Sequence, residues 1–252
     1  MKPSCRALPT SLAAIMPFRA LFLQELNRQI RYNAAHERGW TDSYNLIVNG
    51  VSVGYASVKG QEISNRDTIF EFYVIPPFRT FGLSLFRELL TISQAQYIEA
   101  QSNDLLLTAM LYEVGTNIRS DVILFEDYFQ TAYPLTEAVF RPRQHGEFLH
   151  HSDELGDFVI EFRNEVVAMG GFLRHYNPPF ADLYMEVKEI HRQQGWGTQI
   201  LQEIKKECYL AGRIPAARCN GANIASKATL LKAGFRVSGH LLIGELRNFR
   251  DM

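Results

Sequence analysis

The stretch that decides the fold is Val187-Lys-Glu-Ile-His-Arg192-Gln-Gln-Gly195-Trp-Gly197. It follows an apolar segment, residues 183–187, that is typical of a strand, and it precedes apolar residues at helical spacing, Ile200, Leu201, Ile204 and Cys208. Glycines at a strand-to-helix turn let a ligand approach the backbone, and the first amides of the helix have no intrahelical partner. The helix dipole adds to these amides, so the turn predicts a phosphate or pyrophosphate site. Two glycines alone would favour a tight turn that serves only packing.

A related stretch occurs in the first half of the chain. Val74-Ile-Pro-Pro-Phe-Arg79-Thr-Phe-Gly82-Leu-Ser84 aligns without a gap, and Arg192 lies 113 residues after Arg79. In each half, two strand-like segments joined by a turn come first: residues 45–48 and 51–58, and residues 157–162 and 166–173. The shared order of strands, turn, glycine and helix indicates a duplication. We therefore expect two α/β halves, residues 1–135 and 136–252, with a first helix over residues 17–37.

The composition excludes several classes of protein. Hydrophobic residues make up 46% of the 252 residues and charged residues 21%, which excludes a disordered or collagen-like chain. A net charge of −1 provides no basic field for a polyanion, so we expect no nucleic-acid partner. Cys5, Cys208 and Cys219 show no paired spacing, which fits a reducing compartment. No run approaches the ~20 apolar residues that span a bilayer, so we expect a cytoplasmic protein without a membrane partner.

Two polar segments, residues 145–153 and 175–179, can each be interpreted either as a functional site or as an ordinary connecting loop. Four polar residues fall in an irregular connection without a matching ligand set: His145, His150, His151 and Asp153. We therefore expect a polar connector there and no metal. His175-Tyr-Asn-Pro-Pro179 is either a loop that selects the acceptor of a reaction or an ordinary surface turn.

The turn at Arg192-Gln-Gln-Gly195-Trp-Gly197 resembles the acyl-CoA pyrophosphate loop of the GNAT superfamily of N-acetyltransferases. Val187, a short strand near residues 216–219, and Asn223-Ile-Ala-Ser-Lys-Ala-Thr-Leu-Leu-Lys-Ala-Gly234-Phe235 agree with the family's order and spacing, although Glu189 replaces the usual proline. The resemblance covers about residues 157–247. It implies an α/β (α+β) fold with two GNAT-like mixed β-sheets and flanking helices. It also implies an enzyme that moves an acetyl group from acetyl-CoA to a primary amine.

The resemblance also implies which residues hold the cofactor. The backbone of Met185 and Val187 would bind the pantetheine arm like an added strand, and Asn223 would hydrogen-bond the cofactor near its thiol end. The pyrophosphate would lie on the loop residues Arg192, Gln193, Gln194, Gly195, Trp196, Gly197 and Thr198.

The two halves differ in how well they match the family. The first half has the proline at Pro76, but Phe81 is bulky and Ser84 replaces the second glycine. We interpret it as a degenerate copy with a structural or substrate-shaping role, and a second working site is the alternative. The second half has only residues 143–156 before its hairpin, so the family's first helices are missing or shortened. We expect the first half to close the site.

The residues that move protons are less clearly marked. The family's common tyrosine acid is replaced by Leu230. Ser226 is our candidate for the acid that protonates the leaving thiolate, with Cys219 second, although a helix-start hydroxyl and a buried thiol explain them equally well. Glu186 is a candidate general base, or simply a solvated strand residue. The competing function is a catalytically inactive acyl-CoA-binding sensor or scaffold protein.

Overall fold

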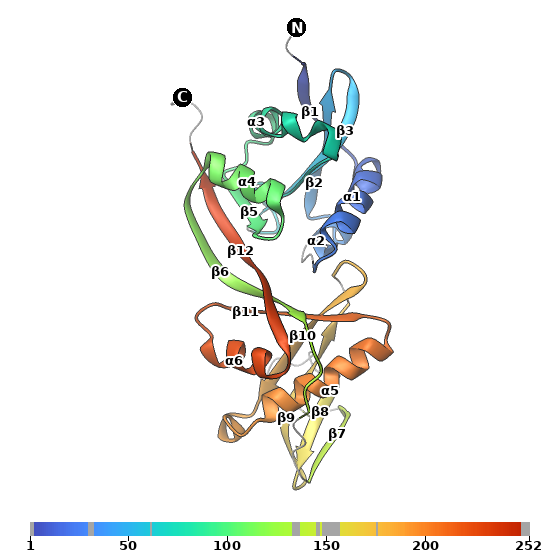
Figure 1. The fold of residues 1–252 in the computed structure, drawn as a ribbon, viewed down its shortest axis with the longest axis vertical. Coiled ribbons are helices and arrows are strands. Elements are labelled where there is room, and N and C mark those ends of the chain that lie inside the picture. Colours follow the sequence, from blue (N-terminus) through green and yellow to red (C-terminus); the bar gives the residue numbers. More distant parts are fainter. Residues whose placement is uncertain are drawn as a thin grey trace. The chain divides into compact units, whose positions relative to one another are not determined.

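The computed structural model (Figure 1) describes residues 3–29, 33–60, 62–132, 137–144, 147, 157–174 and 176–247. The chain forms two compact units, which are Met1–Asp121 with Gly239–Met252 (unit 1) and Val122–Ser238 (unit 2). This division differs from the predicted boundary between residues 135 and 136, which lies outside the described residues. The units divide elsewhere because β6 (Gly115–Asp127) and β12 (Phe235–Leu246) each begin in one unit and end in the other.

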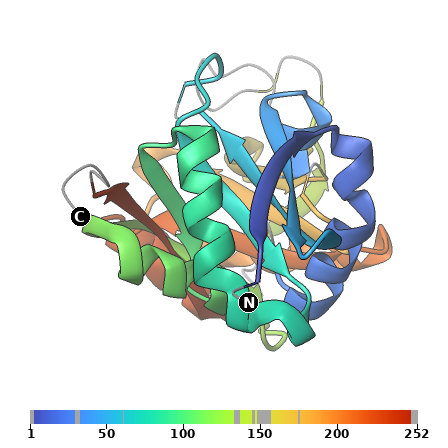
Figure 2. The same ribbon diagram turned by 90° about the horizontal axis from the view of Figure 1, so that it is seen from above.

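Unit 1 is a mixed sheet with helices on both faces. Its strand order is β1-β2-β3-β4-β5-β12. The strands are β1 (Cys5–Thr10), β2 (Thr41–Val48), β3 (Val51–Lys59), β4 (Thr68–Val74) and β5 (Tyr97–Gln101). The helices are α1 (Leu12–Leu26), α2 (Asn33–Glu37), the 3-10 helix η1 (Pro76–Phe81), α3 (Gly82–Ser93) and α4 (Leu105–Val114). Helices α3 and α4 lie on the same face of this sheet (Figure 2). Their apolar side chains belong to the core cluster on that face.

The predicted helix over residues 17–37 is two helices. α1 begins at Leu12, five residues earlier than predicted, because Ser11 caps it: the Ser11 side chain accepts a hydrogen bond from the Ala14 amide. Pro17 lies inside α1, and Asn27 ends the helix in the left-handed conformation. By contrast, the hairpin predicted at Asn49-Gly50 is confirmed, and both turn residues have positive φ angles.

Unit 2 repeats the order of elements found in unit 1. Its strand order is β6-β11-β10-β9-β8-β7. The strands are β7 (Ala138–Pro142), β8 (Phe158–Phe162), β9 (Glu165–Leu173), β10 (Phe180–Val187) and β11 (Ile214–Asn220). The helices are the short η2 (Glu189–His191), α5 (Trp196–Leu210) and α6 (Ile224–Lys232). Among the described residues between β6 and β8 there is one strand, β7, and no helix.

The two halves of the sequence exchange a strand. Residues Val122–Glu126 of β6 pair with β11 in unit 2, whereas Leu241–Glu245 of β12 pair with β5 in unit 1. Each unit is therefore completed by a strand from the other half of the sequence. Each also has its own apolar core, centred on Phe72 and Phe86 in unit 1 and on Phe125 and Ile200 in unit 2.

None of the helices in the described part of the chain is long and apolar enough to cross a bilayer. The residues named for the predicted polar connector (His145, His150, His151 and Asp153) and the predicted loop residue His175 lie outside the described residues.

Candidate functional site

The site of unit 2 starts where two parallel strands separate. β10 pairs with β11 from Phe180 to Leu183, and this pairing stops there. On its other edge, β10 stays paired with β9 through to Val187. The edge of residues 184–187 that faces β11 therefore lies beyond the end of the parallel pairing. Met185 and Val187 belong to this segment, where an amide-containing ligand can add itself as an extra strand.

The turn after β10 presents the start of α5. Gln193 and Gly195 adopt positive φ angles of 62° and 94°. Gly195 is the N-cap of α5, and no side chain caps the helix. Arg192 donates from Nε to the Val187 carbonyl oxygen (3.4 Å), so its side chain braces the turn. An uncapped helix start that follows a glycine in the left-handed conformation suits an anion, because the first-turn amides and the helix dipole act together.

Gly197 leaves a space that any side chain would fill. A Cβ atom on Gly197 would lie 3.0 Å from Cγ2 of Thr229 and 3.4 Å from both Sδ of Met185 and Cγ2 of Val187. These atoms come from the end of β10 and from α6, which border a groove of about 800 Å³ at the start of α5. The groove passes Arg192, Gln193 and Thr198 and reaches Asn223, so it contains most of the residues predicted to bind the cofactor.

Two predicted loop residues point their side chains elsewhere. The Trp196 ring is buried against Phe162, with ring centroids 4.9 Å apart, so Trp196 is a core residue that offers its backbone amide. Gln194 accepts a hydrogen bond from the Trp196 indole and donates to the Ile190 carbonyl oxygen. The Gln194 side chain therefore links the two ends of the turn by hydrogen bonds.

Asn223 starts α6, as predicted. Its carboxamide oxygen accepts a hydrogen bond from the Ser226 backbone amide at 3.0 Å, which makes Asn223 the N-cap of this helix. The residue is exposed and lines the groove. Its oxygen is thus engaged within the helix, and its amide nitrogen is the group suited to a ligand.

Ser226 lies where the groove meets a second pocket. This pocket has a volume of about 410 Å³ and shares Met185 and Ser226 with the groove. Cys219 lines it and is 8% exposed. Burial raises the pKa of the Cys219 thiol, while a hydrogen bond with the Ser226 side chain and the charge of Lys227 act in the opposite direction. The two candidate acids are therefore neighbours that share a hydrogen bond.

Leu230 and Glu186 complete the set of predicted residues. Leu230 is 4% exposed and forms part of the second pocket, so an aliphatic side chain occupies the position of the family's tyrosine. Glu186 lines the groove from the end of β10, next to Met185 and Val187. Its side chain alternates to the opposite face of the sheet from those two residues.

Residues 122–235 match the acetyltransferase (GNAT) family. This part of the chain is a GNAT domain. The mixed α/β fold of the chain agrees with solved GNAT structures. An acetyltransferase of the GNAT family from Colwellia psychrerythraea is similar over 96% of this chain and 100% of its own, with a TM-score of 0.73 and 14% identity. No curated protein is significantly similar to the chain in sequence.

Two further structures share the fold along nearly the whole chain. A tandem GNAT protein from the clavulanic acid biosynthesis pathway is similar over 97% of this chain and 99% of its own, with a TM-score of 0.61 and 12% identity. A GCN5-related N-acetyltransferase from Sphaerobacter thermophilus is similar over 97% and 96%, with a TM-score of 0.60 and 15% identity. At these identities the similarity establishes the fold.

The corresponding turn of unit 1 differs from that of the GNAT domain. Arg79 donates from Nε to the Val74 carbonyl oxygen at 3.0 Å, which repeats the contact of the second turn. Gly82, however, is helical with a φ angle of −50°, and its amide bonds to the Arg79 carbonyl oxygen. The guanidinium of Arg79 also binds the Glu25 carboxylate of α1 at 2.5 and 2.6 Å. The backbone of this turn is thus used within unit 1.

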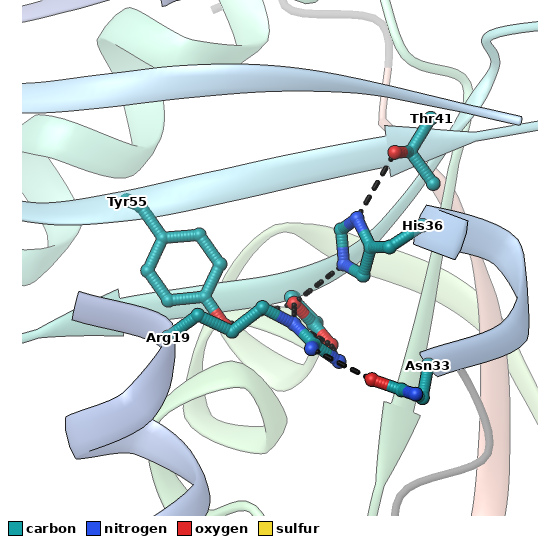
Figure 3. A network of polar contacts seen from close by, with 6 residues as sticks. Arg19, Asn33, His36, Thr41 and Tyr55 are labelled. Atoms are coloured by element: carbon teal, nitrogen blue, oxygen red, sulfur yellow. Dashed lines mark hydrogen bonds and ion pairs between the residues drawn. The ribbon is translucent and has the colours of Figure 1, made fainter. Parts of the chain in front are cut away.

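Unit 1 contains a buried polar network that the sequence analysis missed. The Glu71 carboxylate on β4 is fully buried and accepts hydrogen bonds from Arg19, His36 and Tyr55 at 2.8–3.1 Å (Figure 3). Burial alone would raise the pKa of Glu71, but the charge of Arg19 and the contact with His36 lower it to about 2. The signal in the sequence is the one charged residue within the apolar run Ile69-Phe-Glu-Phe-Tyr-Val-Ile75.

A second missed cluster borders the smaller pocket of the GNAT domain. Asp182, 5% exposed, accepts hydrogen bonds from the Tyr176 hydroxyl at 2.8 Å and from Nε of Arg218 at 3.1 Å. Arg218 also lies over the Tyr176 ring, at 5.9 Å from its centroid. Asp182 interrupts the apolar strand β10, and that interruption was the available signal.

Proposed function

We propose that the GNAT domain of this protein transfers an acetyl group from acetyl-CoA to a primary amine. The observation that carries the proposal is the junction at Met185 and Ser226, where the groove of about 800 Å³ meets the pocket of about 410 Å³. A cofactor in the groove and an acceptor in the pocket would bring their reacting ends together at this junction. Such positioning supplies much of the rate in a two-substrate transfer.

The residues of the site fit acetyl-CoA. The uncapped start of α5 and the space above Gly197 suit the pyrophosphate, and the edge of residues 184–187 suits the amides of the pantetheine arm. When bound, acetyl-CoA supplies an activated thioester. The amine nitrogen forms a bond to the carbonyl carbon, the carbon–sulfur bond breaks, and the amine proton passes to a base or to water.

Ser226 and Cys219 are the groups that can protonate the leaving thiolate. The Ser226 hydroxyl lies at the junction, and burial keeps the Cys219 thiol neutral by raising its pKa. We expect Ser226→Ala to lower kcat roughly 10²-fold or more with little change in acetyl-CoA affinity, because the contact strengthens in the transition state. If Ser226→Ala turns over normally and Cys219→Ala does not, the role of acid passes to the thiol. Glu186 is our candidate for the base, and Glu186→Gln should then lower kcat at neutral pH.

The experiment that tests the function measures release of free CoA thiol from acetyl-CoA with and without a panel of primary amines. Mass spectrometry of each amine should show the acetylated product. The buried Leu230 favours a second candidate, an acyl-CoA-binding sensor or scaffold without catalysis. Tight binding of acetyl-CoA with no release above the spontaneous rate for any amine would support the sensor and contradict the transferase.

A further inference from the structure

The pocket beside the cofactor groove passes through the sheet of the GNAT domain. Leu183 and Met185 lie on the face of β10 that carries the apolar core under α5, whereas Asp182 and Tyr184 alternate to the opposite face. Residues of both faces line the same pocket of about 410 Å³, which is within the range of small-molecule sites. The pocket therefore leads from Ser226 on the helix side to Asp182 and Arg218 on the far side.

Two charged residues line this pocket, and their exposure differs. The Asp182 side chain is 7% exposed and accepts hydrogen bonds from both Tyr176 and Arg218. The Arg218 side chain is 31% exposed. Asp182 is thus engaged in holding the guanidinium, and the charge that reaches the pocket belongs to Arg218. The Tyr176 ring below Arg218 is 1% exposed, so the guanidinium rests on a fixed support.

The other walls determine what can reach this guanidinium. Val122 and Leu173 line the pocket on the far side of the sheet, together with the polar residues Tyr184 and Asn220. Between there and Ser226 the lining is apolar and consists of Leu183, Met185, Leu201 and Leu230. On the neighbouring strand β6, Glu126 binds Arg236 of β12 at 2.7 Å. A ligand here meets a short apolar passage with a guanidinium at one end and the candidate acids at the other.

We propose, on the basis of the transferase function above, that the acceptor is a small amine that carries a carboxylate, as an amino acid does. Arg218 binds the carboxylate, because a planar guanidinium matches its two oxygens. The amine lies at the opposite end, beside Ser226. Among the residues that line this pocket, Asp182 is the one carboxylate, and it already accepts hydrogen bonds from Tyr176 and Arg218. The proton of the amine is therefore left to Glu186, the candidate base in the adjoining groove.

The test compares amino acids with alkylamines of equal chain length. Glycine, β-alanine and γ-aminobutyrate are assayed with acetyl-CoA beside methylamine, ethylamine and propylamine. For the best chain length, we expect kcat/KM of the amino acid to exceed that of its alkylamine at least about tenfold, mainly through KM. Arg218→Gln should bring the two values together, by raising KM for the amino acid far more than for the alkylamine. Arg236→Gln is the matched control, because Arg236 is an exposed arginine of the same unit outside the pocket.

The outcomes separate this inference from the proposed function. Equal kcat/KM for amino acids and alkylamines in the wild type would overturn the carboxylate preference and leave the transferase intact. If no amine is acetylated, the transferase fails, and the binding of β-alanine to the CoA-loaded protein tests the pocket by saturation-transfer NMR. Binding that Arg218→Gln abolishes and Arg236→Gln retains supports the guanidinium site, and binding unaffected by Arg218→Gln contradicts it.

Discussion

Replacing Gly197 by valine should abolish cofactor binding while the protein stays folded. The first added carbon already lies 3.0 Å from Thr229 Cγ2 and 3.4 Å from Met185 Sδ, closer than ordinary packing at the first contact. Valine adds two methyl groups to that carbon, and they must occupy the space above the start of α5. The pyrophosphate would need the same space, so the substitution removes the site sterically.

The size of the effect follows from linkage. At a CoA concentration 100 times its dissociation constant, binding stabilises the wild type by about 2.7 kcal/mol. For a protein of this size that corresponds to a rise in Tm of roughly 5–10 °C. Differential scanning fluorimetry with and without CoA measures the rise, and circular dichroism of the unliganded variant checks its fold. A folded Gly197→Val protein that keeps the full rise in Tm would refute the site.

Unit 1 supplies the control for this experiment. Gly82 occupies the position that corresponds to Gly195, and a Cβ atom there would meet Leu106 Cδ1 at an ordinary 3.5 Å. Gly82 is helical, so alanine fits its backbone. Gly82→Ala should therefore keep the whole CoA-dependent rise in Tm. Loss of the rise in this variant would indicate that unit 1 also binds the cofactor.

Three further predictions concern stability and the division of the chain. Glu71→Gln should destabilise the protein by about 3–5 kcal/mol at pH 7 in urea denaturation, against less than about 1 kcal/mol for the exposed pair variant Glu25→Gln. Because the folded pKa of Glu71 is about 2 and its ordinary value 4.5, its contribution is complete above pH 4.5 and should disappear as the pH falls toward 2. Lys205→Met should lower the free energy of unfolding by a similar amount, because this 3%-exposed lysine pairs with a buried carboxylate of β6. The control Lys206→Met should leave the stability nearly unchanged, because Lys206 is exposed. Equal Tm values for the two variants would contradict this prediction. A fragment of residues 136–252 should aggregate or show no turnover, because β11 loses its β6 partner, while residues 122–238 should stay soluble. A soluble, fully active 136–252 fragment would be the contrary result.

Local signals in the sequence predicted the secondary structure around the candidate cofactor groove. The strand end at Val187, the turn glycines and the Asn223 cap are each specified by a few neighbouring residues. Asn49-Gly50 likewise determines its hairpin, because both positions need the left-handed conformation. The bounds of the first helix were predicted wrongly, because the spacing of apolar residues marks neither the cap at Ser11 nor the left-handed end at Asn27.

Contacts between distant segments could not be read from the sequence. Glu71 binds Arg19 across 52 residues and His36 across 35, and nothing local links these three side chains. Asp182 and Arg218 lie 36 residues apart in sequence, on adjacent parallel strands. The exchange of β6 and β12 leaves no local mark at all, because a strand pattern does not state its partner. The pairing of these strands therefore required the structure.

The difference between the two halves comes down to the backbone of one turn. Both arginines bond to the carbonyl oxygen of the valine that ends the preceding strand, so the brace of the turn persists in unit 1. What changes is the glycine: Gly195 has a φ angle of 94° and starts a helix afresh, whereas Gly82 continues from η1 into α3. Within a continuing helix, the backbone amides donate to carbonyl oxygens of the same chain, so they are not available to bind an anion. Loss of anion binding would not remove the need for this half, because β6, which begins in it, supplies the strand that pairs with β11 of the GNAT domain.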